Sequence, residues 1–309
     1  MHRTLSITVP ATVTESLCQQ LTAIPDVISL SVQPGASRKP PGDIVTIQVL
    51  NRGADEALRL VQDVVPDSRA LSVATSELTS IIAPADAERV MKDKDEAVWE
   101  EIESGLRHQG RVTGNYLSLM ALGGIIAAVG LVSDPVPQAI AFIASSIISP
   151  GFEPLAKIPL GLVLRRWTVA WRGLGSSLAG YTLFALAAGL TMRLLLALGA
   201  SSVAELASNP EVKNLVHPGA KEIILSACGA AAGIIIIAAY RRSVIAGALI
   251  ALVLMPAAAL LGSGLAVGRP DLAWEGVARF SADAGFILAF GTLIFFLKQL
   301  TVHRRQPIE

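Results

Sequence analysis

The chain has 309 residues, of which 52% are hydrophobic and 16% charged, and its formal net charge is zero. A neutral chain lacks the basic face that nucleic-acid phosphates require, so we expect no nucleic-acid partner. Charged residues become scarce after Arg111, which predicts a soluble N-terminal part followed by a membrane part. Cys18 and Cys228 lie in different regions, and no Cys–His cluster has metal-ligand spacing. We therefore expect neither a metal nor a cofactor.

Residues 1–80 show the alternation typical of strands, interrupted by two short helical patterns. The expected strands are 4–9, 27–33, 44–50 and 70–75, and the expected helices are 12–21 and 54–64. This βαββαβ order predicts an α+β domain of the ferredoxin-like, or split βαβ, type. Pro34-Gly35 and Pro40-Pro41-Gly42 are expected to bracket a hairpin-like loop between the second and third strands. Such a domain either senses a small ligand or serves in assembly, and both roles stay open.

Residues 84–111 are expected to form an amphipathic helix, over 85–109, that connects this domain to the membrane part. Apolar residues recur there at near-helical spacing between charged ones. The basic end of the helix, residues 107–111, fits either contact with anionic lipid or the ordinary excess of positive charge on the inner side.

Residues 112–309 are expected to be a polytopic α-helical membrane domain with six transmembrane segments of 16 to 29 residues, where a spanning helix needs about 20. The segments are 116–132, 136–164, 174–198, 222–239, 243–268 and 282–297. Proline interrupts the second and the fifth, because it removes a backbone donor from a helix. The sequence therefore predicts two broken helices, one at 149–154 and one at 254–256.

Each predicted broken helix ends in the same thirteen-residue signature. GLVLRRWTVAWRG, residues 161–173, aligns without gaps with GLAVGRPDLAWEG, residues 264–276. The matching pairs are Gly161/Gly264, Leu162/Leu265, Arg166/Arg269, Ala170/Ala273, Trp171/Trp274 and Gly173/Gly276. This indicates a three-helix unit present twice, about 116–198 and 222–297. An odd number of helices per unit predicts 3+3 inverted repeats, and paired helix breakers are the best sequence pointer to a transporter site.

The placement of lysine and arginine predicts that both termini are cytoplasmic. Eleven of these residues flank the inner ends of the segments: Arg107, Arg111, Lys157, Arg165, Arg166, Arg172, Arg241, Arg242, Lys298, Arg304 and Arg305. Four fall in outer loops: Lys213, Lys221, Arg269 and Arg279. The first residues, MHRTLSITVP, lack the pattern of a secretory signal, which agrees with a cytoplasmic head.

The stretch SPGFEPL, residues 149–155, and the stretch VLMPAAAL, residues 253–260, resemble two features of a bacterial and archaeal family known as an uncharacterised hydrophobic domain of unknown function. In that family a Ser-Pro-Leu-Met-Gly-Pro-like stretch interrupts the second segment and a Val-Pro-Pro-like stretch the fifth. Ser149, Pro150, Pro154 and Pro256 match, whereas residues 151–153 and Ala257 depart from the pattern. The resemblance implies a multi-pass protein of the prokaryotic cytoplasmic (inner) membrane, with an N-terminal ferredoxin-like domain.

The candidate path for a substrate or ion lies at the two predicted breaks, at Ser149, Pro150, Gly151, Glu153, Pro154, Met255 and Pro256. Glu153 is the acid within the broken segment, and an ionisable group at membrane depth is costly unless it faces protein or water. It is either a cation, proton or substrate contact, or a solvated residue with Lys157 as its i,i+4 partner.

Four further residues are secondary candidates: Ser145, Ser146, Arg193 and Asp283. The two serines can bond to backbone groups near the break or line a polar path, and structural bonding is the expected role. Arg193 and Asp283 lie near outer helix ends, where they either pair or extend to solvent.

No enzyme motif is present: the sequence lacks GxSxG, HExxH, Walker A and GxGxxG, and the four histidines lie outside the apolar segments. We therefore expect no catalysis but a transporter or channel for a small solute or ion, with a cytoplasmic regulatory or assembly domain. The expected partners are membrane lipid, that solute or ion, and further copies of the chain in a homo-oligomer. The alternative is a membrane-anchored signalling or scaffold protein whose head senses a ligand or partner.

Overall fold

The computed structural model describes residues 2–78, 80–93, 98–109, 111–239 and 244–301, without the side chains of 108, 109 and 244–253. These residues divide into two compact units, one mainly within 1–99 and the other mainly within 100–299. Arg241, Arg242, Arg304 and Arg305, four of the inner-side residues in the charge count, lie outside the described residues.

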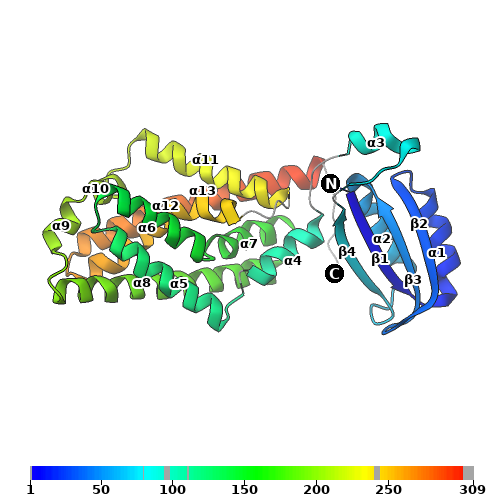
Figure 1. Cartoon of the computed structure of the whole chain (residues 1–309), viewed down its shortest axis with the longest axis horizontal. Helices are drawn as coiled ribbons and strands as arrows, with labels where there is room; N and C mark the ends of the chain where they lie inside the picture. Colours follow the sequence, from blue (N-terminus) through cyan, green and yellow to red (C-terminus); the bar gives the residue numbers. More distant parts are fainter. Residues whose placement is uncertain (1, 79, 94–97, 110, 240–243, 302–309) are drawn as a thin grey trace. The chain divides into compact units, whose positions relative to one another are not determined.

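The N-terminal unit is a four-stranded antiparallel sheet with two helices, and its elements follow the expected order (Figure 1). They are β1 (His2–Val9), α1 (Ala11–Ala23), β2 (Val27–Arg38), β3 (Pro41–Val49), a short 3-10 helix η1 (Asn51–Gly53), α2 (Ala54–Val64) and β4 (Ser72–Leu78). The strands lie in the order β2-β3-β1-β4, and every neighbouring pair is antiparallel. The central strands are thus β1 and β3, which do not follow each other in the chain.

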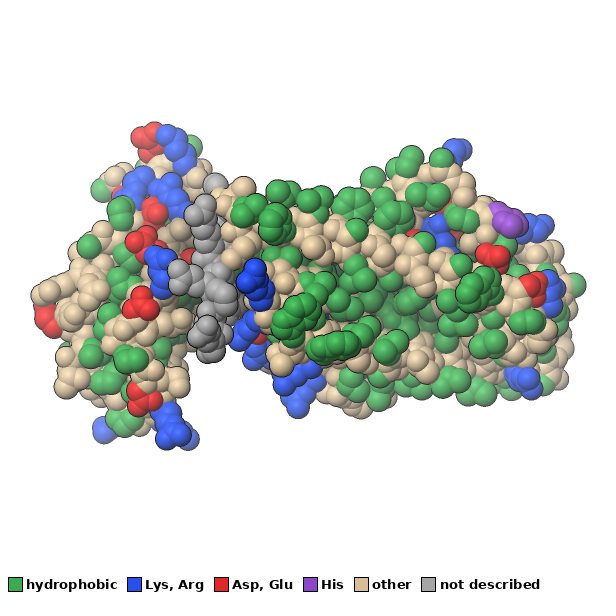
Figure 2. Space-filling view, turned by 180° about the vertical axis from the view of Figure 1, so that it is seen from behind, with side chains coloured by type: hydrophobic (Ala, Val, Ile, Leu, Met, Phe, Trp, Pro, Cys, Tyr) green, Lys and Arg blue, Asp and Glu red, His purple; other side chains and the backbone are tan. Residues whose placement is uncertain are grey.

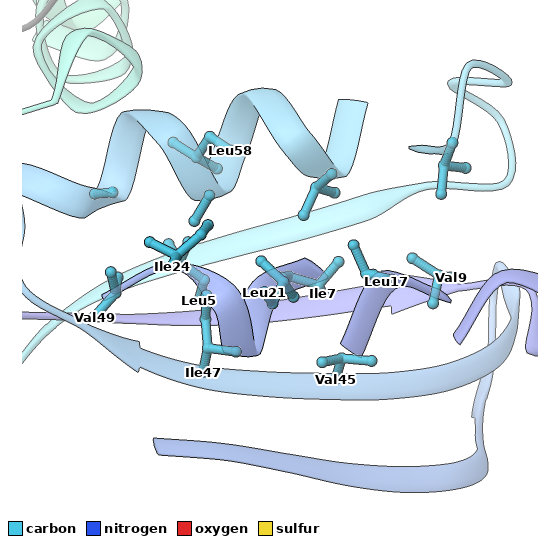
Figure 3. Packing of buried hydrophobic residues seen from close by; sticks show 14 of the residues in the cluster. Leu5, Ile7, Val9, Leu17, Leu21, Ile24, Val45, Ile47, Val49 and Leu58 are labelled. Atoms are coloured by element: carbon cyan, nitrogen blue, oxygen red, sulfur yellow. The ribbon is translucent and has the colours of Figure 1, made fainter. Parts of the chain in front are cut away.

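The core of this unit lies between the two helices and one face of the sheet (Figure 3). Alternate residues of β1, Leu5, Ile7 and Val9, point to the same side because side chains in a strand alternate. In α1, Leu17 and Leu21 are one turn apart and meet this face. The apolar residues repeat every two positions in the strand and every 3.6 positions in the helix, and both sets face the same apolar layer.

The expected loop at Pro34-Gly35 is wrong: β2 continues through both residues to Arg38, and the turn follows at Lys39-Pro40. The pairing of β2 with β3 shifts register between Gln33 and Ser37, which marks a bulge. Gly35 has φ of 61°, and its N–H donates to Asp43 Oδ1 at 2.8 Å, so the two turn-forming residues bend the strand without ending it.

The expected continuous helix over 85–109 is also wrong. A 3-10 turn η2 (Pro84–Asp86) leads into α3 (Ala87–Met91), and a separate helix α4 (Trp99–Gln109) follows. Asp93, just after α3, accepts a hydrogen bond from the backbone N–H of Asn51 at 3.0 Å and pairs with His2 at 2.9 Å. These contacts hold Asp93 against the sheet. Because they fix the chain just after α3, they compete with continuation of that helix.

The second unit is helical. After α4 come α5 (Gly114–Gly130), α6 (Pro135–Ile148), α7 (Phe152–Val163), α8 (Trp167–Ala197), α9 (Val203–Ser208), α10 (Pro210–Val216), α11 (Ala220–Ala238), α12 (Val244–Ala266) and α13 (Pro270–Thr301). Figure 1 shows α5 to α8 and α11 to α13 running roughly along a common direction. Glycines allow their backbones to approach: a methyl group on Gly124 would overlap the Phe184 carbonyl, and one on Gly262 the Ala185 carbonyl.

The apolar surface of this unit is that of a membrane protein. Leu178, Leu186 and Leu190 of α8 are exposed by 61%, 59% and 71%, although leucine usually lies inside a soluble protein. Figure 2 shows hydrophobic side chains spread over the visible face of the helical unit. Among the described residues three helices, α8, α11 and α13, are long and apolar enough to cross a membrane, and the bent pair α6 and α7 makes a fourth. Six crossings are more than these helices support.

The second predicted break is wrong, because α12 continues from Val244 to Ala266 with Pro256 inside it. Pro159 likewise lies inside α7. A proline removes one hydrogen bond from a helix, but packing can hold the helix across that gap. Here α12 packs closely on α8, where Gly189 and Gly262 bring the two backbones together.

Candidate functional site

The chain does break where the sequence predicts it between α6 and α7, which meet at 51°. Ser149 leaves the helical conformation with ψ of 114°, as expected for a residue before proline. Its N–H still closes the last turn of α6 by donating to the Ser145 carbonyl at 3.0 Å. Pro150 has no N–H to give, and the Gly151 N–H donates to the Ser149 carbonyl at 2.8 Å before α7 begins.

Side chains from two other helices meet this break. At Gly151 a Cβ atom would lie 2.5 Å from the Tyr181 hydroxyl of α8 and 2.8 Å from Met255 Cε of α12. Glycine is therefore required for this approach. The structure thus places Met255 beside the first break, as the grouping of these residues in the sequence predicts, although α12 itself is unbroken.

Glu153 is in the first turn of α7, and its Oε2 atom is buried without a hydrogen-bond partner among the described residues. The positive end of the α7 dipole stabilises a carboxylate at this position. Tyr116, Lys157 and Tyr181 are close enough to interact electrostatically with it. The alternative of a fully solvated residue does not fit the burial of Oε2.

Three hydroxyl oxygens also lack a partner among the described residues: that of Ser149 at the break and those of Ser177 and Tyr181 on α8, the helix that meets the break through Tyr181. These residues are only 4%, 5% and 7% exposed. Ser177 and Tyr181 are one turn apart on α8, and so lie on one face of that helix. Buried polar atoms nearly always have a hydrogen-bond partner, so unsatisfied oxygens at a helix break and on the helix beside it suggest a place for a ligand.

Aromatic side chains lie close to Tyr181. The Tyr181 ring packs edge-on against Phe280 of α13, with centroids 4.6 Å apart. The Tyr116 hydroxyl of α5 donates to the Ser176 carbonyl at 2.8 Å, which anchors α5 to α8. Phe280, Tyr116 and Ser177 do not stand out in the sequence, since only the fold brings them to the break.

Ser145 and Ser146 have the structural roles expected of them. The Ser145 hydroxyl donates to the Gly123 carbonyl of α5 at 2.8 Å, and the Ser146 hydroxyl donates to the Ile143 carbonyl of its own helix at 2.8 Å. Pro154 is the third residue of α7, where a missing N–H is tolerated because first-turn donors have no intrahelical partner. Pro256 lies one residue beyond Met255 within α12.

Arg193 and Asp283 do not pair with each other, and this possibility is excluded. Arg193 Nε donates to the Ala266 carbonyl at 2.9 Å. Asp283 pairs instead with Arg279, one turn earlier on α13, with Nε and Oδ2 3.0 Å apart. Arg279 also donates to the Ser226 hydroxyl of α11 at 2.6 Å. The i,i+4 spacing of an arginine and an aspartate was the signal that sequence reasoning missed.

The charge count placed Arg279 wrongly, because it lies inside α13 and is 7% exposed, not in an outer loop. Lys157 and Lys298, counted at inner ends, are also buried, at 5% and 4% exposed, although Lys298 does lie in the last turn of α13. Lys298 Nζ, for example, donates to the Ala238 carbonyl at the end of α11 at 3.2 Å. A hydropathy pattern alone cannot separate a basic residue at a helix end from one packed between helices.

The two signatures form the same turn. Arg165 and Gly268, at equivalent positions, have φ of 53° and 72°. The Arg166 N–H donates to the Gly161 carbonyl at 2.8 Å, and the Arg269 N–H donates to the Gly264 carbonyl at 2.9 Å. A methyl group on Gly161 would crowd the Ala170 N atom, as one on Gly264 would crowd the Ala273 N atom. The thirteen-residue match is therefore a structural repeat of this turn.

The first copy of the turn is held to α4. Glu103 of α4 has a buried side chain that pairs with Arg166 and, at 2.7 Å, with Arg107. In the second copy Arg269 pairs with Asp271 within its own turn at 2.6 Å. The arginine that both copies share is thus neutralised in each, but by partners of different origin.

Comparison with curated proteins and with solved structures gives no match. A family model does match residues 147–289, a stretch that begins just before the α6–α7 break and includes both signature turns. The match agrees with the resemblance to an uncharacterised family over the membrane part, and the family carries the description Domain of unknown function (DUF389).

Proposed function

We propose that the protein is a membrane transporter or channel for a small solute or ion, and that the solute passes the α6–α7 break. The observation that carries this proposal is the Oε2 atom of Glu153, which is buried and has no hydrogen-bond partner among the described residues. A carboxylate oxygen left without a partner inside a membrane protein is costly and suggests a substrate or ion pathway by default. We propose no catalytic reaction for it.

The break itself supports the proposal. Irregular backbone at membrane depth is tolerated where protein buries it or where it lines an aqueous path. The C-terminal end of α6 and the N-terminal end of α7 both terminate here, which exposes carbonyls on one side and N–H groups on the other. Transporters use such half-helix ends to bind charged substrates.

We also propose that the two signature turns belong to inverted repeats of three helices each. The repeated hydrogen bonds and the positive φ at Arg165 and Gly268 support this. In the gapless alignment Pro256 takes the place of Glu153, so the second copy lacks the carboxylate. The proposed site is then asymmetric: the first copy contributes the carboxylate that contacts the solute, and the second copy contributes the continuous helix α12 beside it.

Orientation in the membrane follows from the same proposal. With both termini in the cytoplasm of a prokaryotic cell, exposed Thr168 of the first turn faces inside and exposed Asp271 of the second faces outside. Single Thr168→Cys, Asp271→Cys, Ser208→Cys and Gln306→Cys variants distinguish the sides with an impermeant thiol reagent on intact cells, in a Cys18→Ser/Cys228→Ser background. We expect labelling at 208 and 271 only; labelling at 306 contradicts the orientation.

For the N-terminal unit we propose a ferredoxin-like domain that regulates or assembles the membrane part within a homo-oligomer embedded in lipid. The strand order β2-β3-β1-β4 with two helices supports the fold. The alternative, a scaffold whose head is the active part, predicts that flux does not depend on residues at the break.

The test is flux through proteoliposomes that contain the full chain. Internal dyes report H⁺ and Na⁺, ⁸⁶Rb⁺ reports larger alkali ions, and light scattering reports glycerol as a neutral solute. We expect at least one flux above empty vesicles, and its loss in Glu153→Gln. Glu275→Gln, the same change at another half-exposed acid of the helical unit, is the matched control. Wild-type flux in a folded Glu153→Gln variant contradicts the proposal.

A further inference from the structure

We infer that the site at the α6–α7 break binds a small, hard monovalent cation such as Na⁺, held by the Glu153 carboxylate and the hydroxyl oxygens of Ser149, Ser177 and Tyr181. The inference rests on the proposed function, because it names the substrate or coupling-ion class of the same site. It starts from the chemistry of the unsatisfied atoms: all four are oxygens, and one carries a charge.

The donor set selects the class of ligand. Hard cations prefer carboxylate, hydroxyl and carbonyl oxygens, whereas softer metals prefer sulfur or imidazole. The residues that meet at the break include no histidine and no cysteine. Met255 Cε lies against Gly151 on the side of α12, and a thioether is a poor ligand for a hard ion.

The Glu153 carboxylate supplies one negative charge, and the buried Lys157 ammonium within electrostatic range already opposes part of it, so a monovalent ion fits better than a divalent one. A divalent ion at this site would leave a net buried charge, which is costly at low dielectric. The helix ends at the break also favour a cation. The C-terminal end of α6 points its last carbonyls toward the break, and the negative end of its dipole attracts a cation.

The position of the oxygens is set by packing from three helices. Ser149 sits at the break itself, where a methyl group on Gly123 of α5 would overlap its hydroxyl oxygen. Tyr181 of α8 touches the break at Gly151 and is held edge-on by Phe280. Glu153 follows in the first turn of α7 and interacts electrostatically with Tyr181. Oxygens placed by separate elements lose little entropy when an ion binds.

Lys157 makes the sign of the ligand charge testable. It is buried one turn after Glu153 on α7, within electrostatic range of the carboxylate. Its ammonium group competes with a bound cation, so removal of that charge strengthens cation binding. For an anionic or zwitterionic ligand the same change weakens binding, because it removes an attractive charge.

The experiment measures the melting temperature of the full chain in detergent at constant ionic strength, with NaCl, LiCl or KCl replacing choline chloride. A ligand that binds the folded state raises the melting temperature in a saturable manner. We expect such a rise with Na⁺, its loss in Glu153→Gln, and an apparent Kd about tenfold higher in Ser177→Ala, because a ligand oxygen is removed. In Lys157→Met we expect an apparent Kd about tenfold lower than in wild type.

Ser263→Ala is the matched control, because Ser263 is a buried α12 serine whose hydroxyl also lacks a partner among the described residues. We expect Na⁺ binding to be unchanged in it. Size-exclusion profiles show whether each variant folds. If Glu153→Gln does not fold, the Ser177→Ala variant still tests the inference. A response equal for all salts, or one retained in Glu153→Gln and Ser177→Ala, overturns the inference. If flux depends on Glu153 but Na⁺ does not stabilise the protein, the cation inference fails and the proposed function stands.

Discussion

Arg165 and Gly268 occupy the same left-handed position in two copies of one turn, with φ of 53° and 72°. A left-handed backbone is unfavourable for a residue with a Cβ atom and is routine for glycine. The first copy thus carries strain that the second avoids. Arg165 is exposed.

This difference predicts unequal effects of substitution. We expect Gly268→Ala to lower the free energy of unfolding by about 1 kcal/mol, because alanine takes on the left-handed strain. Arg165→Gly should change it little, because relief of strain is offset by the greater freedom of glycine in the unfolded chain. Thermal melts in detergent, followed by tryptophan fluorescence, measure both. An equal loss of unfolding free energy in the two variants would contradict the prediction, because only Gly268→Ala adds a Cβ atom to a left-handed residue.

Close helix packing gives a second prediction. Gly262→Ala places a methyl group against the Ala185 carbonyl, so α12 and α8 must separate. We expect a loss of about 1–3 kcal/mol, the usual range for overpacking. Gly175→Ala on α8 is the control, because its backbone is helical and no neighbouring atom lies within 4 Å of the place that the added methyl group would take. The control should be neutral or gain up to about 1 kcal/mol from helix propensity.

The buried pair of Arg279 and Asp283 gives a third. Asp283→Asn leaves the arginine charge without its counter-ion, and we expect a loss of about 3–5 kcal/mol. The double change Arg279→Met with Asp283→Leu removes both charges and should recover most of that loss. Ser226 stays satisfied in the double variant, because its hydroxyl also donates to the Glu222 carbonyl at 2.9 Å. A double variant as unstable as Asp283→Asn would show that the pair has another role.

A fourth prediction concerns pH and the sheet unit. The backbone N–H of Gly35, and then the Thr14 hydroxyl at 2.7 Å, hold the pKa of Asp43 below its usual value. A carboxylate with a lowered folded pKa adds stability that is complete above its unfolded pKa, about 3.9, and is lost as the pH falls through the folded value.

Asp43→Asn should therefore destabilise the unit at neutral pH, and the difference from wild type should shrink as the solution is acidified below about pH 4. Hydrogen exchange of residues 35–49 in the full chain measures this locally. Asp63→Asn, on the neighbouring α2, serves as the comparison. A difference that is constant from pH 7 to pH 3 would show that shape, not charge, makes Asp43 important.

The sequence by itself determined the order of elements in the sheet unit, the position of the α6–α7 break and the repeated turn. These features depend on short-range chemistry: alternation of side chains in strands, the conformational limits before proline, and glycine where backbones approach. The register of β2 and the gap after α3 were missed, because Asp43 and Asp93 act through contacts with residues distant in the chain.

Only the tertiary structure decided which prolines break helices and which polar residues meet. Pro150 and Pro256 carry the same local signal, but the packing of α12 on α8 keeps one helix continuous. Tyr181 meets the break only because α8 packs beside it, and Asp283 pairs with Arg279 and not with Arg193. Periodicity sets which face of a helix is apolar, but the pairing of faces depends on contacts that have no pattern along the chain.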